Sequence, residues 1–525
     1  MKVVIIGMGV AGLTSAILSA EAGDETTLVV KTTDPYLSAS AWAQGGIVYA
    51  GENDSPSQLM TDMQNVSGGM TRTETLHLLA HEGPPFIKDF LIKKIHVPFA
   101  KTNPPPHTPN TNHTPKNNDY LLTKEAGHQC NRILFSGDQT GEVIVKMLYE
   151  YLIEHTKITI LWDHLALDLI NIPHHSTDPM SVYEETHCVG VYVLDKKTNN
   201  VKKQFADKII LATGGIGQIY KQTTNPPTAT GDGIAIAHRA GARIINMEFT
   251  QFHPTSLAVK KANSFLISEA LRGEGATLLN EQGQDFISPI DKRGALTPRD
   301  KLSRLIIAEQ QKNHEDHVYL SFKDCTFSLQ ERFPKIYQKC KSLGLDLERK
   351  QIPVTPAFHF SCGGILVDRS SQTSVKNLYA VGECACTGVH GANRLASTSL
   401  LEASYFAAQA VLHKPSELYS IAQTSISDWR IAKNPIAIDP VLLYQDLMTV
   451  QSIMWNYVGI IRKNHTLSRA LKELFFLKER VDEYYRTSIP TQNIVELRNT
   501  VQTALLVTES AIKNTHSVGS HYLQD

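Results

Sequence analysis

The sequence predicts an α/β fold in which a domain built on a parallel sheet is split by an inserted α+β domain and followed by a helical bundle. Three observations carry this prediction: a glycine-rich turn between an N-terminal strand and helix, later apolar runs that end in glycine, and a C-terminal region with helical periodicity. At 525 residues the chain is too long for one compact core, so several domains are expected.

The N-terminus has the order strand, glycine turn, helix, strand: VVIIG, GMGVAG, LTSAILSAEAG and TTLVVK. Gly7 permits the tight turn, Gly9 lets the backbone approach a pyrophosphate, and Gly12 packs the helix on the strand. This βαβ unit predicts a Rossmann-like dinucleotide site. Lys31 ends the second strand where an acid would bind the ribose of NAD, which argues against a plain NAD site.

Two later segments, 208–213 (KIILAT) and 377–382 (NLYAVG), are apolar and closed by glycine, as buried parallel strands are. The mixed composition between them indicates an inserted domain, and from about residue 416 the chain predicts a bundle of about three helices. The expected domains are the first part of the Rossmann-like domain (1–236), a capping, substrate-binding domain (237–353), the second part (354–415) and a C-terminal helical domain (416–525).

Composition narrows the class of partner. A formal net charge of −1 gives no field of one sign to attract nucleic acid or a membrane, so a small molecule is expected. Glycines interrupt the apolar start, and no run of eighteen apolar residues follows, so a cytoplasmic protein is expected. The seven scattered cysteines fit reduced thiols, and Cys384-Ala385-Cys386 lacks the second pair of a metal site; no metal is predicted. The Pro- and His-rich stretch 101–118 is expected to be a surface insertion.

Further glycine-marked segments predict contacts with a ligand. The segment 38–46 (SASAWAQGG) and the pair Gly214-Gly215 let backbone donors come close, and Glu383 at a strand end suits a ribityl or ribose hydroxyl. Candidate substrate residues lie in segments marked by glycine and proline; they are His253, Ser268, Glu269, Arg272, Arg299, His359 and the run His390–Arg394. Arginine matches a carboxylate and histidine adds donors, although spacing alone does not show that these residues converge.

Five motifs resemble the flavoproteins of the succinate dehydrogenase and fumarate reductase superfamily, in the same order along the whole chain. They are MEFTQFHPT (247–255), LRGEG (271–275), PRD (298–300), His359 with Gly363-Gly364, and HGANR (390–394). The resemblance implies FAD as cofactor. Ala39 stands where the membrane-complex members have the histidine that binds FAD covalently, so non-covalent FAD is expected. LTKEAGH (122–128) resembles the segment of the L-aspartate oxidase family that places a glutamate, here Glu125, beside the substrate.

This resemblance implies FAD-dependent oxidation of L-aspartate to iminoaspartate, with O2 (giving H2O2) or fumarate as acceptor, and delivery of the product to quinolinate synthase in NAD biosynthesis. Arg299 would act at the reacting carbon, Glu125 would orient the amino group, and the carboxylates would be held by His253, Ser268, His359 and Arg394. Glu269 is a further expected substrate-binding residue. The implied FAD contacts are Gly7, Gly9, Val10, Ala11, Gly12, Lys31, Ala39, Ser40, Ala41, Trp42, Ala43, Gln44, Gly45, Gly46, Asp232, Glu383, Ser399 and Leu400.

The chain departs from the family pattern at four positions: Ser268 replaces threonine, Thr250 and Thr398 replace asparagine, and Ala126 replaces glycine. Two alternative functions remain open. A fumarate reductase or succinate dehydrogenase subunit would need an iron–sulfur partner and the covalent histidine. A flavin-binding protein without catalysis would have no need of Arg299 and both histidines.

Overall fold

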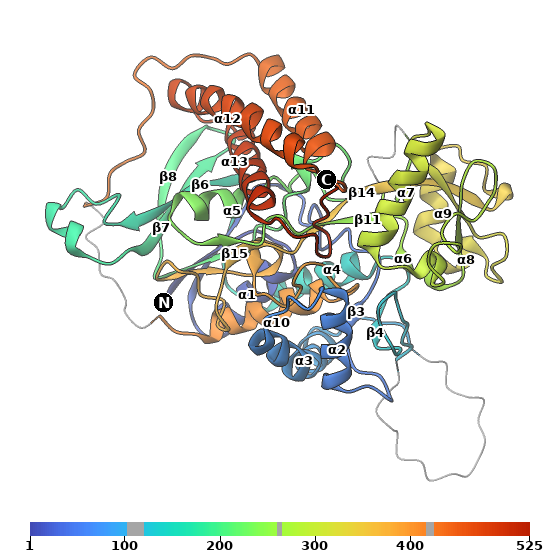
Figure 1. Cartoon of the computed structure of the whole chain (residues 1–525). Coiled ribbons are helices and arrows are strands. Elements are labelled where there is room, and N and C mark those ends of the chain that lie inside the picture. Colours follow the sequence, from blue (N-terminus) through green and yellow to red (C-terminus); the bar gives the residue numbers. More distant parts are fainter. Residues whose placement is uncertain (102–119, 260–264, 416–424, 525) are drawn as a thin grey trace, which may run out of the picture.

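The computed structural model describes residues 1–101, 120–259, 265–415 and 425–524 and contains a five-stranded parallel sheet of order β16-β9-β1-β2-β5 (Figure 1). Its strands are β1 (Lys2–Ile6), β2 (Glu25–Val30), β5 (Thr159–Trp162), β9 (Lys208–Leu211) and β16 (Leu378–Ala380). The parallel pairing of β1 with β2 and of β9 with β16 confirms the predicted βαβ unit and both later strands. All of the predicted insertion 101–118 except its first residue lies outside the described residues.

The two faces of this sheet belong to different cores. Val3 and Ile5 pack into one core and Val4 and Ile6 into the other, because successive side chains of a strand point to opposite faces. Helices cover the first face: α1 (Val10–Glu21), α2 (Pro56–Val66), α3 (Thr73–Ile87), α4 (Thr140–His155) and α10 (Ser399–Leu412). The second face packs on an antiparallel sheet of β6 (His164–Ile172), β7 (His187–Asp195) and β8 (Asn200–Phe205), and on α5 (Asp232–Arg239).

The inserted region forms a lobe with a core of its own, at the right of Figure 1. Its antiparallel sheet has the order β11-β14-β13-β12, with β11 (Thr250–Leu257), β12 (Thr277–Leu279), β13 (Val318–Ser321) and β14 (Gln351–Ser361). Its helices are α6 (Glu269–Gly273), α7 (Arg299–Asn313), α8 (Leu329–Arg332) and α9 (Pro334–Ser342). The long strands β11 and β14 continue from this lobe toward the parallel-sheet domain (Figure 1).

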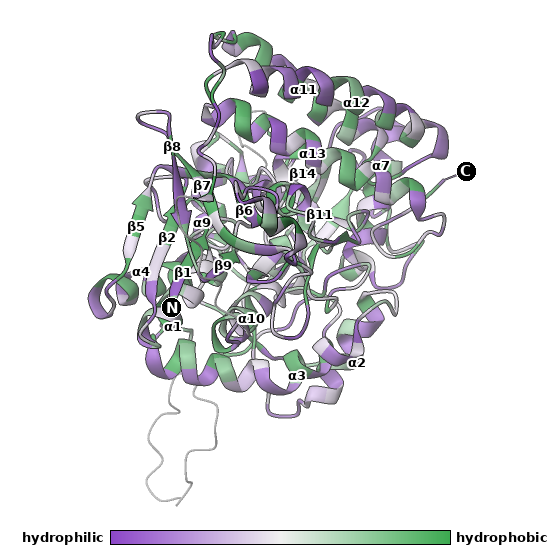
Figure 2. Ribbon diagram, turned by 90° about the vertical axis from the view of Figure 1, so that its left-hand side faces the viewer, coloured by the Kyte–Doolittle hydropathy of each residue, from purple (hydrophilic) through white to green (hydrophobic). Residues whose placement is uncertain are grey.

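The described residues 425–524 contain three helices, α11 (Pro440–Tyr457), α12 (Asn464–Thr487) and α13 (Gln492–Lys513), which confirms the predicted helical C-terminal region. Hydrophilic and hydrophobic stretches alternate along them (Figure 2), as expected of helices with one buried face. Their apolar residues join the core on the second face of the parallel sheet.

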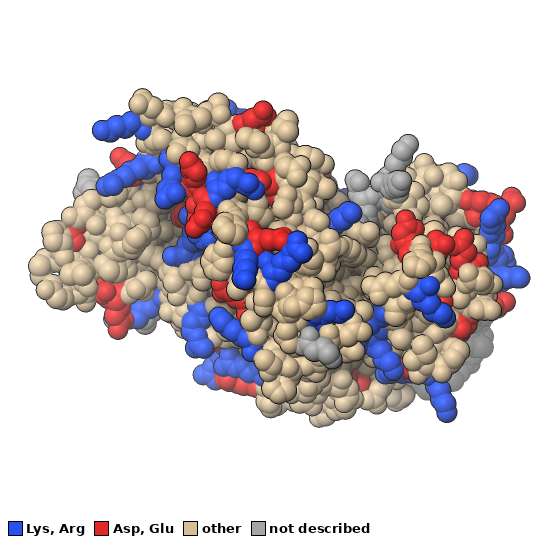
Figure 3. Space-filling view, turned by 45° about the horizontal axis from the view of Figure 1, so that its top comes forward, with Lys and Arg blue, Asp and Glu red and all other residues tan. Residues whose placement is uncertain are grey.

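The remaining strands are short and form two small sheets. In one, β3 (Ile47–Val48) pairs with β4 (Ile133–Leu134). In the other, β15 (Gly364–Leu366) lies between β10 (Ile244–Ile245) and β17 (Ala385–Cys386). Among the described residues, no helix has the length and apolarity needed to cross a membrane. Acidic and basic side chains are interspersed over the face shown in Figure 3, in keeping with the net charge of −1.

Candidate active site

The glycine-rich turn brings backbone close to backbone where β1 ends. Gly7 has φ +111°, and a Cβ on it would lie 2.2 Å from the carbonyl oxygen of Ala212. A Cβ on Gly12 would lie 1.9 Å from the carbonyl oxygen of Gly7, so this glycine allows the helix to pack on the turn. Gly9 and Ala11, at the start of α1, line the cavity, and Gly9 has no side chain that could cap the helix. The Val10 N–H donates to the Ser40 hydroxyl at 3.2 Å. A helix N-terminus that opens on a cavity suits a pyrophosphate.

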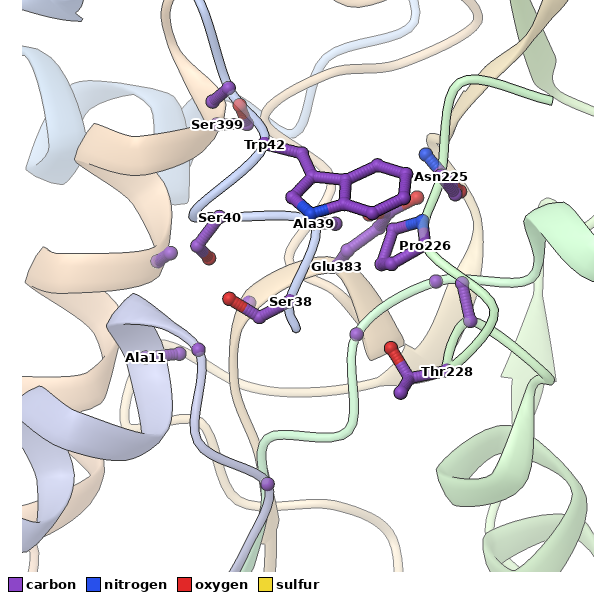
Figure 4. A pocket seen from close by; sticks show the side chains of 18 of the residues that line it. Ala11, Ser38, Ala39, Ser40, Trp42, Asn225, Pro226, Thr228, Glu383 and Ser399 are labelled. Carbon is purple, nitrogen blue, oxygen red and sulfur yellow. The ribbon is translucent and has the colours of Figure 1, made fainter. Parts of the chain in front are cut away.

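One large cavity extends from this turn to the inserted lobe. Fifteen of the predicted FAD contacts line it: Gly7, Gly9, Ala11, Lys31, Ala39, Ser40, Trp42, Ala43, Gln44, Gly45, Gly46, Asp232, Glu383, Ser399 and Leu400. Val10, Gly12 and Ala41 do not line it. Figure 4 shows the loop of Ser38 to Trp42 facing the loop of Asn225 to Thr228, with the Trp42 ring next to Pro226.

Lys31 lies in a buried group of charges. Its Nζ donates to Asp232 (2.7 Å) and Glu496 (2.9 Å) and to the Thr230 hydroxyl (2.8 Å). Burial lowers the pKa of Lys31, but the two carboxylates more than offset this, so the ammonium is retained. Glu496 lies on α13, so a C-terminal helix holds Lys31 in place where β2 ends at the cavity.

The residues along the cavity fit FAD. Burial raises the pKa of Glu383 to about 7, so at neutral pH its carboxyl group both donates to and accepts from hydroxyl groups. The Gln44 Oε1 atom is buried without a hydrogen-bond partner among the described residues, an acceptor available to a flavin N–H. Ala39 offers no nucleophile for a covalent link to the flavin.

The predicted substrate residues converge on the same cavity. They come from the start of α6 (Ser268, Glu269), the start of α7 (Arg299), the neighbouring strands β11 (His253) and β14 (His359), and two loops (Glu125, Arg394). The register of β11 against β14 shifts on both sides of Phe252 and His253. Irregularities of this kind change the direction of side chains next to a site. Two candidates, Arg272 and His390, do not line the cavity. His390 is buried against Glu402 of α10, with Nε2 2.8 Å from Oε2.

Gln251 connects the two arginines. Its Oε1 accepts from Arg299 Nη1 at 3.0 Å and lies 3.5 Å from Arg394 Nη2. Its amide nitrogen donates to the Arg394 carbonyl oxygen (2.8 Å) and to the side chain of Asn393 (2.7 Å). Gln251 is not among the site residues predicted from the sequence; the available signal is its place two residues before His253 on one strand.

Both histidines are neutral; His253 is buried and His359 is partly buried. Burial, followed by the charge of Arg299, holds the pKa of His253 well below its usual value; burial and Arg394 do the same for His359. The Thr255 N–H donates to His253 Nδ1 at 3.2 Å, which leaves the ring proton on Nε2. The two rings lie 5.1 Å apart between centroids. They therefore supply neutral hydrogen-bonding groups without adding charge.

A buried carboxylate supports Arg299. Glu269 Oε2 accepts from Arg299 Nε at 2.6 Å, and Arg272 Nη2 lies 3.4 Å from the same oxygen. Burial alone raises the pKa of Glu269, but the two arginines bring it below its usual value, so Glu269 is ionised. Burial and Arg299 lower the pKa of Arg394 to about 10, so Arg394 also stays charged at neutral pH. Arg394 Nε is buried with no hydrogen-bond partner among the described residues.

Glu125 is a further buried carboxylate in the cavity. Its Oε2 accepts a hydrogen bond from the Ser397 hydroxyl at 2.7 Å, and it forms no ion pair among the described residues. Burial raises its pKa, and the neighbouring charge of Glu269 raises it further. A carboxylate held in this way provides a site for a cation, in the same cavity as two arginines that provide sites for anions.

Comparison with known proteins places this geometry in a class. Residues 2–400 match the model of the FAD binding domain family, and residues 448–525 match that of the fumarate reductase flavoprotein C-terminal domain. An E. coli quinol fumarate reductase structure superposes with a TM-score of 0.84 at 25% identity, covering 100% of this chain and 91% of that one. A Mycobacterium smegmatis Sdh1 structure superposes with a TM-score of 0.77 at 26% identity, covering 99% and 88%. The fold and the site thus define an FAD-dependent flavoprotein of the fumarate reductase type.

Curated relatives narrow the class further. "L-aspartate oxidase 1" of Ralstonia nicotianae is 40% identical over 100% of this chain and 95% of its own length. The Vibrio cholerae L-aspartate oxidase is 36% identical over the same shares, and the chloroplastic rice enzyme is 34% identical over 99% and 81%. The chain belongs to the L-aspartate oxidase family.

Proposed function

We infer that this protein is an FAD-dependent L-aspartate oxidase, which converts L-aspartate to iminoaspartate with O2 or fumarate as electron acceptor. One observation carries the inference: a buried carboxylate, Glu125, lies in the same cavity as Arg299 and Arg394. Two guanidinium groups complement two carboxylates, and Glu125, which unlike Glu269 is not paired with an arginine among the described residues, complements one ammonium group. Succinate and fumarate have no group for Glu125 to bind, whereas aspartate has one.

We propose the following roles. Arg299 lies at the reacting carbon, where its fixed charge stabilises the substrate, and it delivers a proton when fumarate is reduced. His253, Ser268, His359 and Arg394 bind the carboxylates, Glu269 holds Arg299 in place, and Glu125 orients the ammonium group. Glu269, which accepts from Arg299 Nε and is itself ionised, supports its part of this assignment. When bound, FAD supplies a two-electron acceptor for the α-hydrogen of aspartate and passes the electrons to O2 or fumarate.

The reaction balances without a metal ion or a second cofactor. L-aspartate loses a hydride from its α-carbon and a proton from its amino group, which leaves the imine iminoaspartate. O2 takes up two electrons and two protons to form H2O2, and fumarate takes up the same to form succinate. In water the imine hydrolyses to oxaloacetate and ammonia, which provides a product assay.

We propose that the protein acts in the cytoplasm, as the first enzyme of NAD biosynthesis, and that its imine passes to quinolinate synthase. The instability of the imine in water supports rapid transfer to the next enzyme. We also propose the division into residues 1–236 and 354–415 for FAD, 237–353 for capping the substrate, and 416–525 for the helical domain. The separate apolar core of the inserted lobe supports this division.

Turnover in air tests the proposed function. Purified protein is mixed with L-aspartate, D-aspartate or succinate, and O2 uptake, peroxide and oxaloacetate are measured. We expect equal amounts of peroxide and oxaloacetate with L-aspartate alone. Turnover of succinate and not of L-aspartate would move the protein to the fumarate reductase and succinate dehydrogenase type, for which the absence of a histidine at Ala39 is the opposing observation.

A further inference from the structure

Ser397 connects the flavin-binding loop with Glu125. Its hydroxyl donates to Glu125 Oε2 at 2.7 Å and accepts from the Gly46 N–H at 3.2 Å. Its backbone carbonyl accepts from the Val48 N–H at 3.0 Å. All of these partners lie at least 272 residues away along the chain. Ser397 thus fixes the loop that carries Gly45 and Gly46 relative to the carboxylate of Glu125.

The chemistry of a hydroxyl group gives this contact a direction. A serine hydroxyl has one proton to donate. Because Ser397 Oγ accepts from Gly46 N–H, its proton is directed to Glu125 Oε2. The other carboxylate oxygen, Oε1, faces Gly45, where a Cβ would come within 2.8 Å of it. The arrangement occupies Oε2 with a neutral donor and leaves Oε1 for a ligand.

The backbone at this position is unusual for serine. Ser397 has φ +59°, in the left-handed region that residues other than glycine rarely adopt. A nearby hydrogen bond of 2.9 Å between His128 Nε2 and the Ala396 carbonyl oxygen also connects the segment of Glu125 with that of Ser397. Burial lowers the pKa of His128 to about 4, so this imidazole does not titrate near neutral pH. A side chain retained in a strained backbone next to a site points to a function for that side chain.

We propose that Ser397 is a positioning residue that determines specificity for the amino group: its hydroxyl orients Glu125 so that the Oε1 atom receives the substrate ammonium, and it favours the ionised carboxylate. This inference rests on the proposed function and deepens it. Without the hydroxyl, Glu125 would be free to rotate and would lose a donor that stabilises its charge. The contacts of Arg299 and Arg394 do not involve Ser397, so binding of the two carboxylates is affected less.

Several charges face Glu125 and set the background for its titration. Glu269 of α6 disfavours its ionised form, whereas Arg299 of α7 and Arg394 of the 390–394 loop favour it. Arg272 of α6 also interacts with its charge. His253 and His359, in the same cavity, are neutral. Removal of the Ser397 hydroxyl leaves all of these groups unchanged, so a shift in the pKa of Glu125 reports on the hydroxyl itself.

The test compares Ser397→Ala and Ser397→Gly with Ser404→Ala, in both the native and the Glu125→Gln backgrounds. Ser397→Gly also removes the hydroxyl but accepts the positive φ, so it keeps the test valid if the alanine variant folds poorly. Ser404 is a fitting control because it is a buried serine of α10 whose hydroxyl, among the described residues, bonds only to the Leu400 carbonyl oxygen. Bound FAD is measured first, then flavin reduction by L-aspartate and flavin reoxidation by fumarate, each as a function of pH.

We expect both Ser397 variants to raise the L-aspartate concentration needed for half-maximal flavin reduction by about tenfold or more, because each removes a hydrogen bond to a charged group. The acid limb of the aspartate pH profile should move to higher pH, and reoxidation by fumarate should change much less. In the Glu125→Gln background the effect of Ser397→Ala should largely disappear. Equal losses in both half-reactions, an unmoved acid limb, or additive losses with Glu125→Gln would each overturn the proposal. If native protein is not reduced by L-aspartate at all, the proposed function fails first.

Discussion

The cavity has two regions that differ in how their charges are balanced. The Arg299 guanidinium donates to ionised Glu269 and to Gln251 Oε1, and the Arg394 guanidinium donates to the Ser399 hydroxyl at 2.7 Å. Glu125 has instead a single neutral donor, Ser397, and a pKa raised by burial. The first region is complete before substrate arrives and suits any four-carbon dicarboxylate. The second is short of one positive charge, which the ammonium group of L-aspartate supplies.

Removal of Arg299 tests the first region and should have the largest effect. Arg299→Leu should lower both fumarate reduction and aspartate oxidation by at least about 10²- to 10³-fold, because it removes a fixed charge at the reacting carbon. FAD should remain bound, since the FAD contacts lie elsewhere in the cavity. Steady-state rates and the flavin spectrum measure both outcomes. Arg293→Leu, an exposed arginine paired with Asp291, is the control. Retained activity in Arg299→Leu would remove this residue from the mechanism.

Neutralising Glu125 tests the second region. Glu125→Gln should weaken aspartate turnover by about 10- to 150-fold, the value of a hydrogen bond between charged groups. Fumarate reduction should be spared in comparison, because fumarate has no amino group. The two half-reactions are measured separately by stopped-flow absorbance. Glu309→Gln, a carboxylate with little exposure that bonds Asn280 and Asn313 outside the cavity, serves as the control. An equal loss in both half-reactions would contradict the division into two regions.

Gln251 should affect both substrates alike. Gln251→Leu removes the acceptor that fixes Arg299 Nη1 and the donor to the Arg394 carbonyl, and we expect KM for L-aspartate and for fumarate to rise together by roughly tenfold. The control is Gln310→Leu, a buried glutamine of α7 that does not line the cavity. A change confined to L-aspartate would show that Gln251 belongs to the amino-group region instead.

The pH dependence of turnover should differ between L-aspartate and fumarate, an effect smaller than those of the substitutions above. Burial and Glu269 raise the pKa of Glu125, so its carboxylate is lost at a higher pH than that of an exposed glutamate. On acidification, kcat/KM for L-aspartate should therefore fall by up to about tenfold per pH unit below that pKa, and Glu125→Gln should remove this limb. The limb should be absent when fumarate reduction is followed. A limb that persists in Glu125→Gln belongs to another group.

The local features of the fold could be predicted from the sequence, whereas the contacts between residues far apart in the chain could not. The strand–turn–helix order around Gly7 and the apolar strands near 208 and 377 depend on residues that are neighbours in the sequence, so they could be predicted. The contact of Ser397 with Glu125 joins residues 272 apart, and Lys31 meets Glu496 at a separation of 465. No pattern of spacing reveals such pairs. The motif resemblance supplied Glu125, but only the fold shows which neutral donor and which charges surround it.

Anaerobic mixing with single substrates tests the central claim most directly. The flavin absorbance of the oxidised protein is followed after addition of L-aspartate, and separately of succinate. We predict rapid bleaching by L-aspartate alone and the appearance of peroxide once air is admitted. Bleaching by succinate with none by L-aspartate would contradict the account, because the dicarboxylate region would then act without the ammonium site at Glu125.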